Sequence, residues 1–142
     1  MYEQDYIMRL IKEMVRTLLK LLFNVDTDSP SAELLEERED KQLLNDLLTM
    51  VDDGRIDEAE NKIYEITEND DKNNLKIAVL FYANLNNKSD AFLEQHNFSR
   101  DEIKSGLWDV VEKYEGNDFA DMFFGIIRKI QKEENYGNEC SQ

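Results

Sequence analysis

The chain has 142 residues, of which 41% are hydrophobic and 35% charged, and its formal net charge at pH 7 is −15. This length and apolar content predict one folded domain with a single core, and they exclude a disordered chain. The negative charge repels phosphate backbones, so nucleic acid is excluded as an expected partner.

Residues 5–23 carry the strongest helical pattern. Apolar residues recur at 7, 10, 11, 14, 15, 18, 21 and 22, which is the spacing of an amphipathic helix. Its polar side holds Arg9, Lys12, Arg16 and Lys20 within an arc of about 80°, since successive residues are about 100° apart. These charges interrupt the apolar run, so the segment predicts neither a secretory signal nor a membrane span.

A cluster of turn formers predicts a linker over residues 24–31. Ser29 is expected to cap the next helix, with Pro30 at its first helical position. That helix is expected to run to Val51, and Gly54 then supplies the left-handed residue that ends many helices. A second helix follows over about 56–66 and completes a first helical hairpin.

Two further hairpins are expected before the C-terminus. Residues 74–85 are apolar nearly all round, which predicts a helix at the centre of the core, and a short helix follows from Ser89. In the third pair, Ser99 and Glu102 have the spacing of a capping box, and 115–117 predicts a turn before a last helix. We therefore expect one all-α domain over 1–134, made of the N-terminal helix (1–23), the linker (24–31) and three stacked antiparallel hairpins (32–134), followed by a flexible tail over 135–142.

The three pairs share a weak internal repeat. Ala59, Ala91 and Ala120 each stand near the start of a second helix, where a small side chain lets antiparallel helices approach closely. The first pair resembles a tetratricopeptide repeat at Leu43, Gly54, Asp57, Glu58, Ala59, Ile63 and Ile66. The resemblance implies stacked hairpins with a groove for a peptide, although Leu47 and Asp71 depart from the pattern. A generic helical bundle with the same packing needs is the alternative.

The whole chain also resembles an uncharacterised bacterial family of small acidic helical proteins with a domain of unknown function. The resemblance lies in residues 2–9, 26–30 and 98–102. It implies no activity.

The sequence contains no recognisable catalytic or metal-binding pattern. Its one histidine, His96, precedes a helix cap, and its one cysteine, Cys140, lies near the C-terminus, so no nucleophile–base pair is indicated. The 32 acidic residues show neither zinc nor calcium ligand spacing. We therefore expect a protein that is not an enzyme and uses no metal or cofactor. The single cysteine is typical of a reducing compartment, so we expect a cytoplasmic protein.

We expect the protein to be a non-catalytic protein–protein interaction or adaptor module. Residues 1–23 carry four cations and three carboxylates, so they are net +1 and the remainder is −16. This helix either docks on the acidic body or leaves part of its apolar side for another protein or a second copy. The candidate interface residues are Ile7, Arg9, Leu10, Lys12, Met14, Arg16, Leu18 and Lys20. The alternatives are a peripheral membrane-associated regulator that uses this helix, and a small enzyme with an unrecognised carboxylate site.

Overall fold

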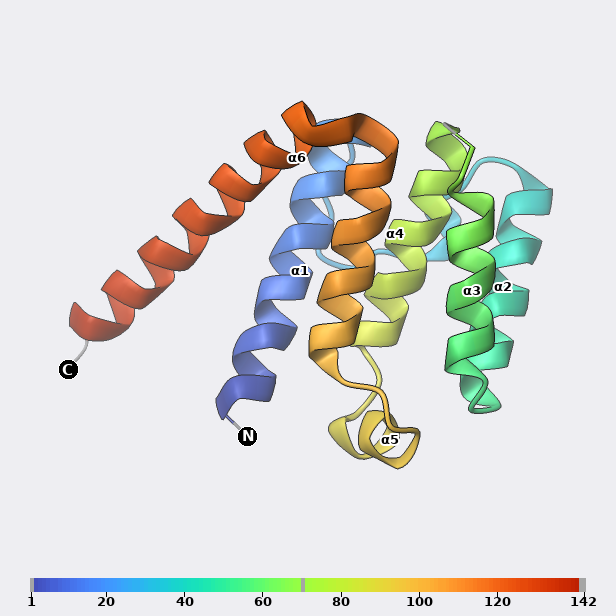
Figure 1. The fold of residues 1–142 in the computed structure, drawn as a ribbon, viewed down its shortest axis with the longest axis horizontal. Helices are drawn as coiled ribbons and strands as arrows, with labels where there is room; N and C mark the ends of the chain where they lie inside the picture. The colour runs from blue at the N-terminus through green and yellow to red at the C-terminus, as the bar shows by residue number, and fades with distance from the viewer. Residues whose placement is uncertain (1, 70, 141–142) are drawn as a thin grey trace.

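The computed structural model describes residues 2–69 and 71–140, and this part of the chain is all-α, as expected. Its elements are α1 (Tyr2–Phe23), a 3₁₀ turn η1 (Ala32–Leu34), α2 (Arg38–Asp52), α3 (Ile56–Ile66), α4 (Lys72–Asn86), α5 (Asp90–Gln95) and α6 (Arg100–Cys140) (Figure 1).

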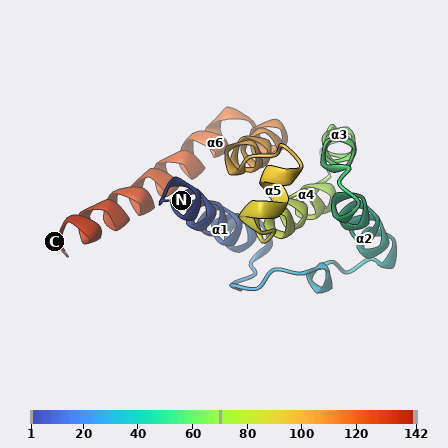
Figure 2. The ribbon, with the colours of Figure 1, turned by 90° about the horizontal axis from the view of Figure 1, so that it is seen from below.

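Helix α4 lies at the centre of the molecule, which confirms the expectation from its apolar sequence. It packs against α1, α2 and α6, and ten of its fifteen residues are buried. Figure 2 shows α1 and α6 on one side of α4 and the pair α2–α3 on the other. A helix with neighbours on both sides has little surface left for solvent, which is why its sequence lacks a polar face.

The segment between α1 and α2 differs from the prediction. Ser31, and not Ser29, is the capping residue: its side chain accepts a hydrogen bond from the Glu33 backbone N–H at the start of η1. Leu35 is extended and buried, so the chain leaves η1 before α2 begins at Arg38. The predicted start of this helix is therefore wrong, because burial of Leu35 fixes an extended residue inside the expected helix.

Helices α2 and α3 form the predicted first hairpin. Gly54 has φ of +87°, the left-handed conformation expected at the end of α2. Ala59 is fully buried, in agreement with a close helix contact. The repeat does not extend to the second pair, because Ala91 is exposed on α5. The side chain of Ala120 lies outside the described residues.

The caps of α5 and α6 are the predicted serines. The Ser89 hydroxyl accepts a hydrogen bond from the Phe92 N–H at 3.0 Å. Ser99 and Glu102 form the capping box: Glu102 Oε2 accepts from the Ser99 N–H at 2.8 Å, and the Ser99 hydroxyl accepts from the Glu102 N–H at 3.2 Å.

Helix α6 continues through the predicted turn at 115–117 and through the expected tail as far as Cys140. One glycine in a helix costs only about 1 kcal/mol relative to alanine, which does not end a helix by itself. The helix nevertheless bends sharply (Figure 1). The rings of Trp108 and Phe123 are 5.9 Å apart, whereas a straight helix would separate residues at this spacing by about 22 Å. The bend therefore brings two parts of α6 into contact: the first limb, which holds Trp108, and the second limb, which holds Phe123.

Candidate functional site

The eight predicted interface residues of α1 fall into two sets. Four are exposed and form what we call the cationic row: Arg9, Lys12, Arg16 and Lys20. Leu10, Met14 and Leu18 are at most 5% exposed and belong to the core, and Ile7 is half-buried against it. Other parts of the chain cover Leu10, Met14 and Leu18. Of the eight predicted interface residues, the four of the cationic row are therefore the most exposed to solvent.

The wide apolar side of α1 has two neighbours within the same chain. It packs against both α4 and α6, and the side chains that become buried are Leu10, Ile11, Met14, Val15, Leu18 and Leu19. A helix that rests on one surface needs an apolar stripe of about 100°. Contact with two helices therefore explains the apolar arc of roughly 180° that the helical wheel of α1 shows.

Arg16 is the member of the cationic row with a carboxylate partner. Its Nε lies 3.1 Å from Asp26 Oδ1 in the linker, and both side chains are about half exposed. Among the described residues, Arg9, Lys12 and Lys20 have no carboxylate within ion-pair distance. Exposed ion pairs contribute at most about 1 kcal/mol, so even Arg16 is free to exchange partners.

A groove of about 560 Å³ with both polar and apolar lining residues lies beside the row, between α1, the linker and the end of α4. Lys12 and Arg16 line it together with Glu13 and Asp28, so its charged groups balance. The groove therefore offers polar and apolar contacts next to the cationic row and adds no net charge to it.

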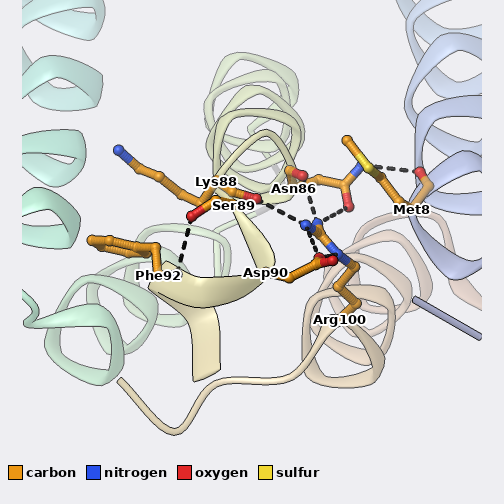
Figure 3. A network of polar contacts seen from close by, with 7 residues as sticks. All are labelled: Met8, Asn86, Lys88, Ser89, Asp90, Phe92 and Arg100. Atoms are coloured by element: carbon orange, nitrogen blue, oxygen red, sulfur yellow. Dashed lines mark hydrogen bonds and ion pairs between the residues drawn. The ribbon is translucent and has the colours of Figure 1, made fainter. Parts of the chain in front are cut away.

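Arg100 is the most deeply buried charged residue among the described side chains, at 2% exposure. Figure 3 shows the polar contacts around it. Its guanidinium donates to the Asn86 carbonyl and side-chain oxygens at 2.6 and 3.0 Å, to the Lys88 carbonyl at 2.8 Å, and to Asp90 Oδ1. Asn86 in turn donates to the Met8 carbonyl of α1 at 3.0 Å. Arg100 of α6 thus binds α4 and α5 directly and is linked to α1 through Asn86, so these contacts serve the fold.

A second polar cluster lies between α3, α4 and α6. The Tyr82 hydroxyl donates to Glu60 Oε2 at 2.9 Å, and the Tyr64 hydroxyl lies 3.5 Å from the same oxygen. Gly106 of α6 closes the cluster: a β-carbon there would stand 2.4 Å from the Tyr82 hydroxyl and 2.7 Å from Glu60 Oε2. A glycine inside a helix often marks such a close approach, and this was the one sequence signal for the cluster.

Burial raises the pKa of the Glu60 carboxyl, and the nearby carboxylates of Asp57 and Glu102 raise it further, while the Tyr82 hydrogen bond opposes them. Burial also raises the pKa of Tyr82 and of Tyr64, and the Glu60 charge adds to both. A shifted carboxyl group is a common feature of catalytic sites. Here both tyrosines direct their hydroxyls to Glu60 and Gly106 leaves no space for a substrate, so the cluster has the geometry of a packed polar contact.

His96 has a structural environment. It lies against Gly54, where a β-carbon would stand 2.8 Å from its ring, and its ring is 4.5 Å from that of Phe92. Cys140 contributes no described side chain. Among the residues whose side chains are described, no three His, Cys, Asp or Glu side chains gather as metal ligands would. No described helix is long and apolar enough to cross a membrane.

A comparison with known protein families finds a match. A family model described as a family of unknown function (DUF6483) matches residues 1–115, so the match ends within α6. No curated protein and no solved structure matches the chain.

Proposed function

Because the chain belongs to DUF6483, a family of unknown function, we propose a function from its surfaces: it is a non-catalytic protein-interaction module that binds an acidic partner through the cationic row. The observation that carries the proposal is the exposure of four cations along α1 in a molecule whose residues after α1 carry a net charge of −16.

Charge complementarity defines the kind of partner. A row of four cations attracts a carboxylate-rich face of another protein. The acidic remainder of the surface repels the same face, so the partner binds on the side of the row. The apolar side of α1 is packed against α4 and α6, which supports a protein partner over insertion of this helix into a membrane. The proposal places the protein in the cytoplasm, and its single cysteine supports this.

The decisive experiment compares three forms of the protein as bait in an extract of the native host. The first is wild type, and the second replaces the row (Arg9→Gln, Lys12→Gln, Arg16→Gln and Lys20→Gln). The third is a control with the same change in charge at exposed positions elsewhere (Arg38→Gln, Lys62→Gln, Lys129→Gln and Lys132→Gln). Glutamine is uncharged and has nearly the same helix propensity as arginine and lysine, so all three should fold.

We expect the row variant to lose a protein that the wild type and the control both retain. The captured protein should have an acidic face, and salt above about 0.3 M should release it, because exposed charges are screened over a few ångströms there. Light scattering of the purified protein tests a second copy as the partner. Equal capture by all three forms, together with a mass that is independent of salt, would contradict the proposal.

A further inference from the structure

A pocket of about 330 Å³ lies where α1 meets the two limbs of α6. Leu10 and Met14 of α1 line it from one side, and Trp108 and Ile127 line it from the two limbs. An engineered cavity of about 150 Å³ in another protein holds a benzene molecule. The pocket is therefore large enough for an aromatic ring with a short chain.

The pocket is held in place by the fold. Leu10, Met14 and Ile127 are at most 5% exposed, and Trp108 is fixed against Phe123 of the second limb, with their ring centroids 5.9 Å apart. Its walls come from segments nearly 120 residues apart in the chain, so it exists because the bend of α6 returns the second limb to α1. A preformed apolar wall binds a ligand without a large ordering cost.

The net charge of the pocket is opposite in sign to that of the whole molecule. Lys104 and Arg128 line it with one carboxylate, Asp109, so the pocket carries one net positive charge in a chain of −15. Among the residues whose side chains are described, neither cation has a carboxylate within ion-pair distance. The Ser105 hydroxyl at the same site adds a hydrogen-bond donor. Cations beside an apolar wall are suited to a ligand with a ring and an anionic end.

We propose that this pocket, lined by Leu10, Met14, Lys104, Trp108, Ile127 and Arg128, binds a small aromatic carboxylate. The ring packs against Trp108, above the buried side chains of Leu10, Met14 and Ile127, and the carboxylate accepts hydrogen bonds from Lys104 and Arg128. The site is separate from the cationic row and does not depend on the protein-interaction proposal.

Trp108 makes the test direct, because it is the one tryptophan of the chain. The full chain is titrated with 3-phenylpropionate while the emission of Trp108 is recorded, and the heat of binding is measured on the same samples. We expect saturation with a dissociation constant between roughly 10 μM and 1 mM, the range that an efficient ligand of this size reaches. The neutral amide of the same acid should bind about tenfold more weakly, because it lacks the charge.

Variants locate the binding. Lys104→Gln and Arg128→Gln should each weaken binding of the acid by about threefold or more and leave the amide unaffected, because each removes one charged donor. Lys129→Gln, next to Arg128 but outside the pocket, is the matched control and should bind like the wild type. The absence of saturation in both fluorescence and heat would overturn the proposal. Equal affinity for acid and amide, or wild-type affinity in both pocket variants, would overturn it as well.

Discussion

Gly106 is the residue at which α6 comes closest to the cluster of Glu60, Tyr64 and Tyr82. We expect Gly106→Ala to lower the free energy of unfolding, because the added methyl group would meet the Tyr82 hydroxyl at 2.4 Å. Overpacking typically costs about 1–3 kcal/mol, which exceeds the gain of up to about 1 kcal/mol in helix propensity.

Gly125 supplies the control for this prediction, because a β-carbon there meets nothing within 4 Å. Gly125→Ala, in the same helix, should leave stability unchanged or raise it by up to about 1 kcal/mol. Urea denaturation of both variants checks the prediction. If Gly106→Ala proved as stable as Gly125→Ala, the close approach described here would not exist.

Glu60 makes a prediction about pH. Its pKa is raised in the folded protein above the ordinary value of 4.5, so folding favours the protonated carboxyl. This contribution to stability is fully present below pH 4.5 and is lost as the pH rises through the folded-state pKa. Relative to the wild type, Glu60→Gln should therefore be more stable at pH 7.5 than it is at pH 4.

Denaturation of both proteins at the two pH values measures this difference. All other titrating groups are shared, so their contributions cancel in the comparison. Glu65→Gln, an exposed change on the same helix, should show no comparable dependence on pH. A constant difference between Glu60→Gln and the wild type across this range would refute the assignment.

At the scale of the element, the capping box fixes where α6 begins. Ser99→Ala removes the oxygen that accepts a hydrogen bond from the Glu102 N–H, so we expect a loss of about 1 kcal/mol in the free energy of unfolding. Ser105→Ala, at an exposed position inside the same helix, should cause no loss, because alanine is the better helix former. Chemical denaturation measures the free energy of unfolding of both variants. A loss for Ser99→Ala and none for Ser105→Ala distinguishes the capping serine from an exposed one.

The helix boundaries show where local and long-range effects compete. Gly54 and the capping serines act within a few residues, and the helices end or begin beside them. The turn formers at 115–117 do not end α6, since the contact between Trp108 and Phe123 is reached by bending an unbroken helix. Leu35 delays α2 in the same way, through burial.

At the scale of the molecule, Arg100 of α6 binds α4 and α5 and is linked to α1 through Asn86. Arg100→Met keeps an unbranched apolar stem, removes the guanidinium, and leaves the Asn86 carbonyl and side-chain oxygens without their donor. Each buried group left unsatisfied costs about 1–3 kcal/mol, so for these two oxygens we expect a total loss of roughly 2–6 kcal/mol.

Asp90→Asn is the matched comparison for Arg100→Met. Asp90 is 53% exposed, so water can replace its contact and the loss should stay below about 1 kcal/mol. Thermal melts of both variants measure the effect. Similar losses for the two would mean that the backbone contacts of Arg100 contribute little to the fold.

The sequence by itself determined the features that depend on neighbouring residues. The spacing of apolar residues predicted α1 and the central position of α4. A helix buried on one side has apolar residues on that side of every turn, and a helix buried on all sides has them all round. The spacing of Ser99 and Glu102 predicted the cap of α6, and the charges of α1 predicted the exposed cationic row. These features are encoded within segments of a few turns, so they could be read without the fold.

The tertiary structure alone decided the features that depend on residues far apart in the chain. The pattern of α1 did not show that α4 and α6 cover its apolar side, so Leu10, Met14 and Leu18 were expected at an interface and lie in the core. Nothing local marks Arg100 as buried or pairs Glu60 with Tyr82, since these contacts form when separate helices pack. The pocket beside Trp108 has the same origin, because its walls meet only after α6 bends back to α1.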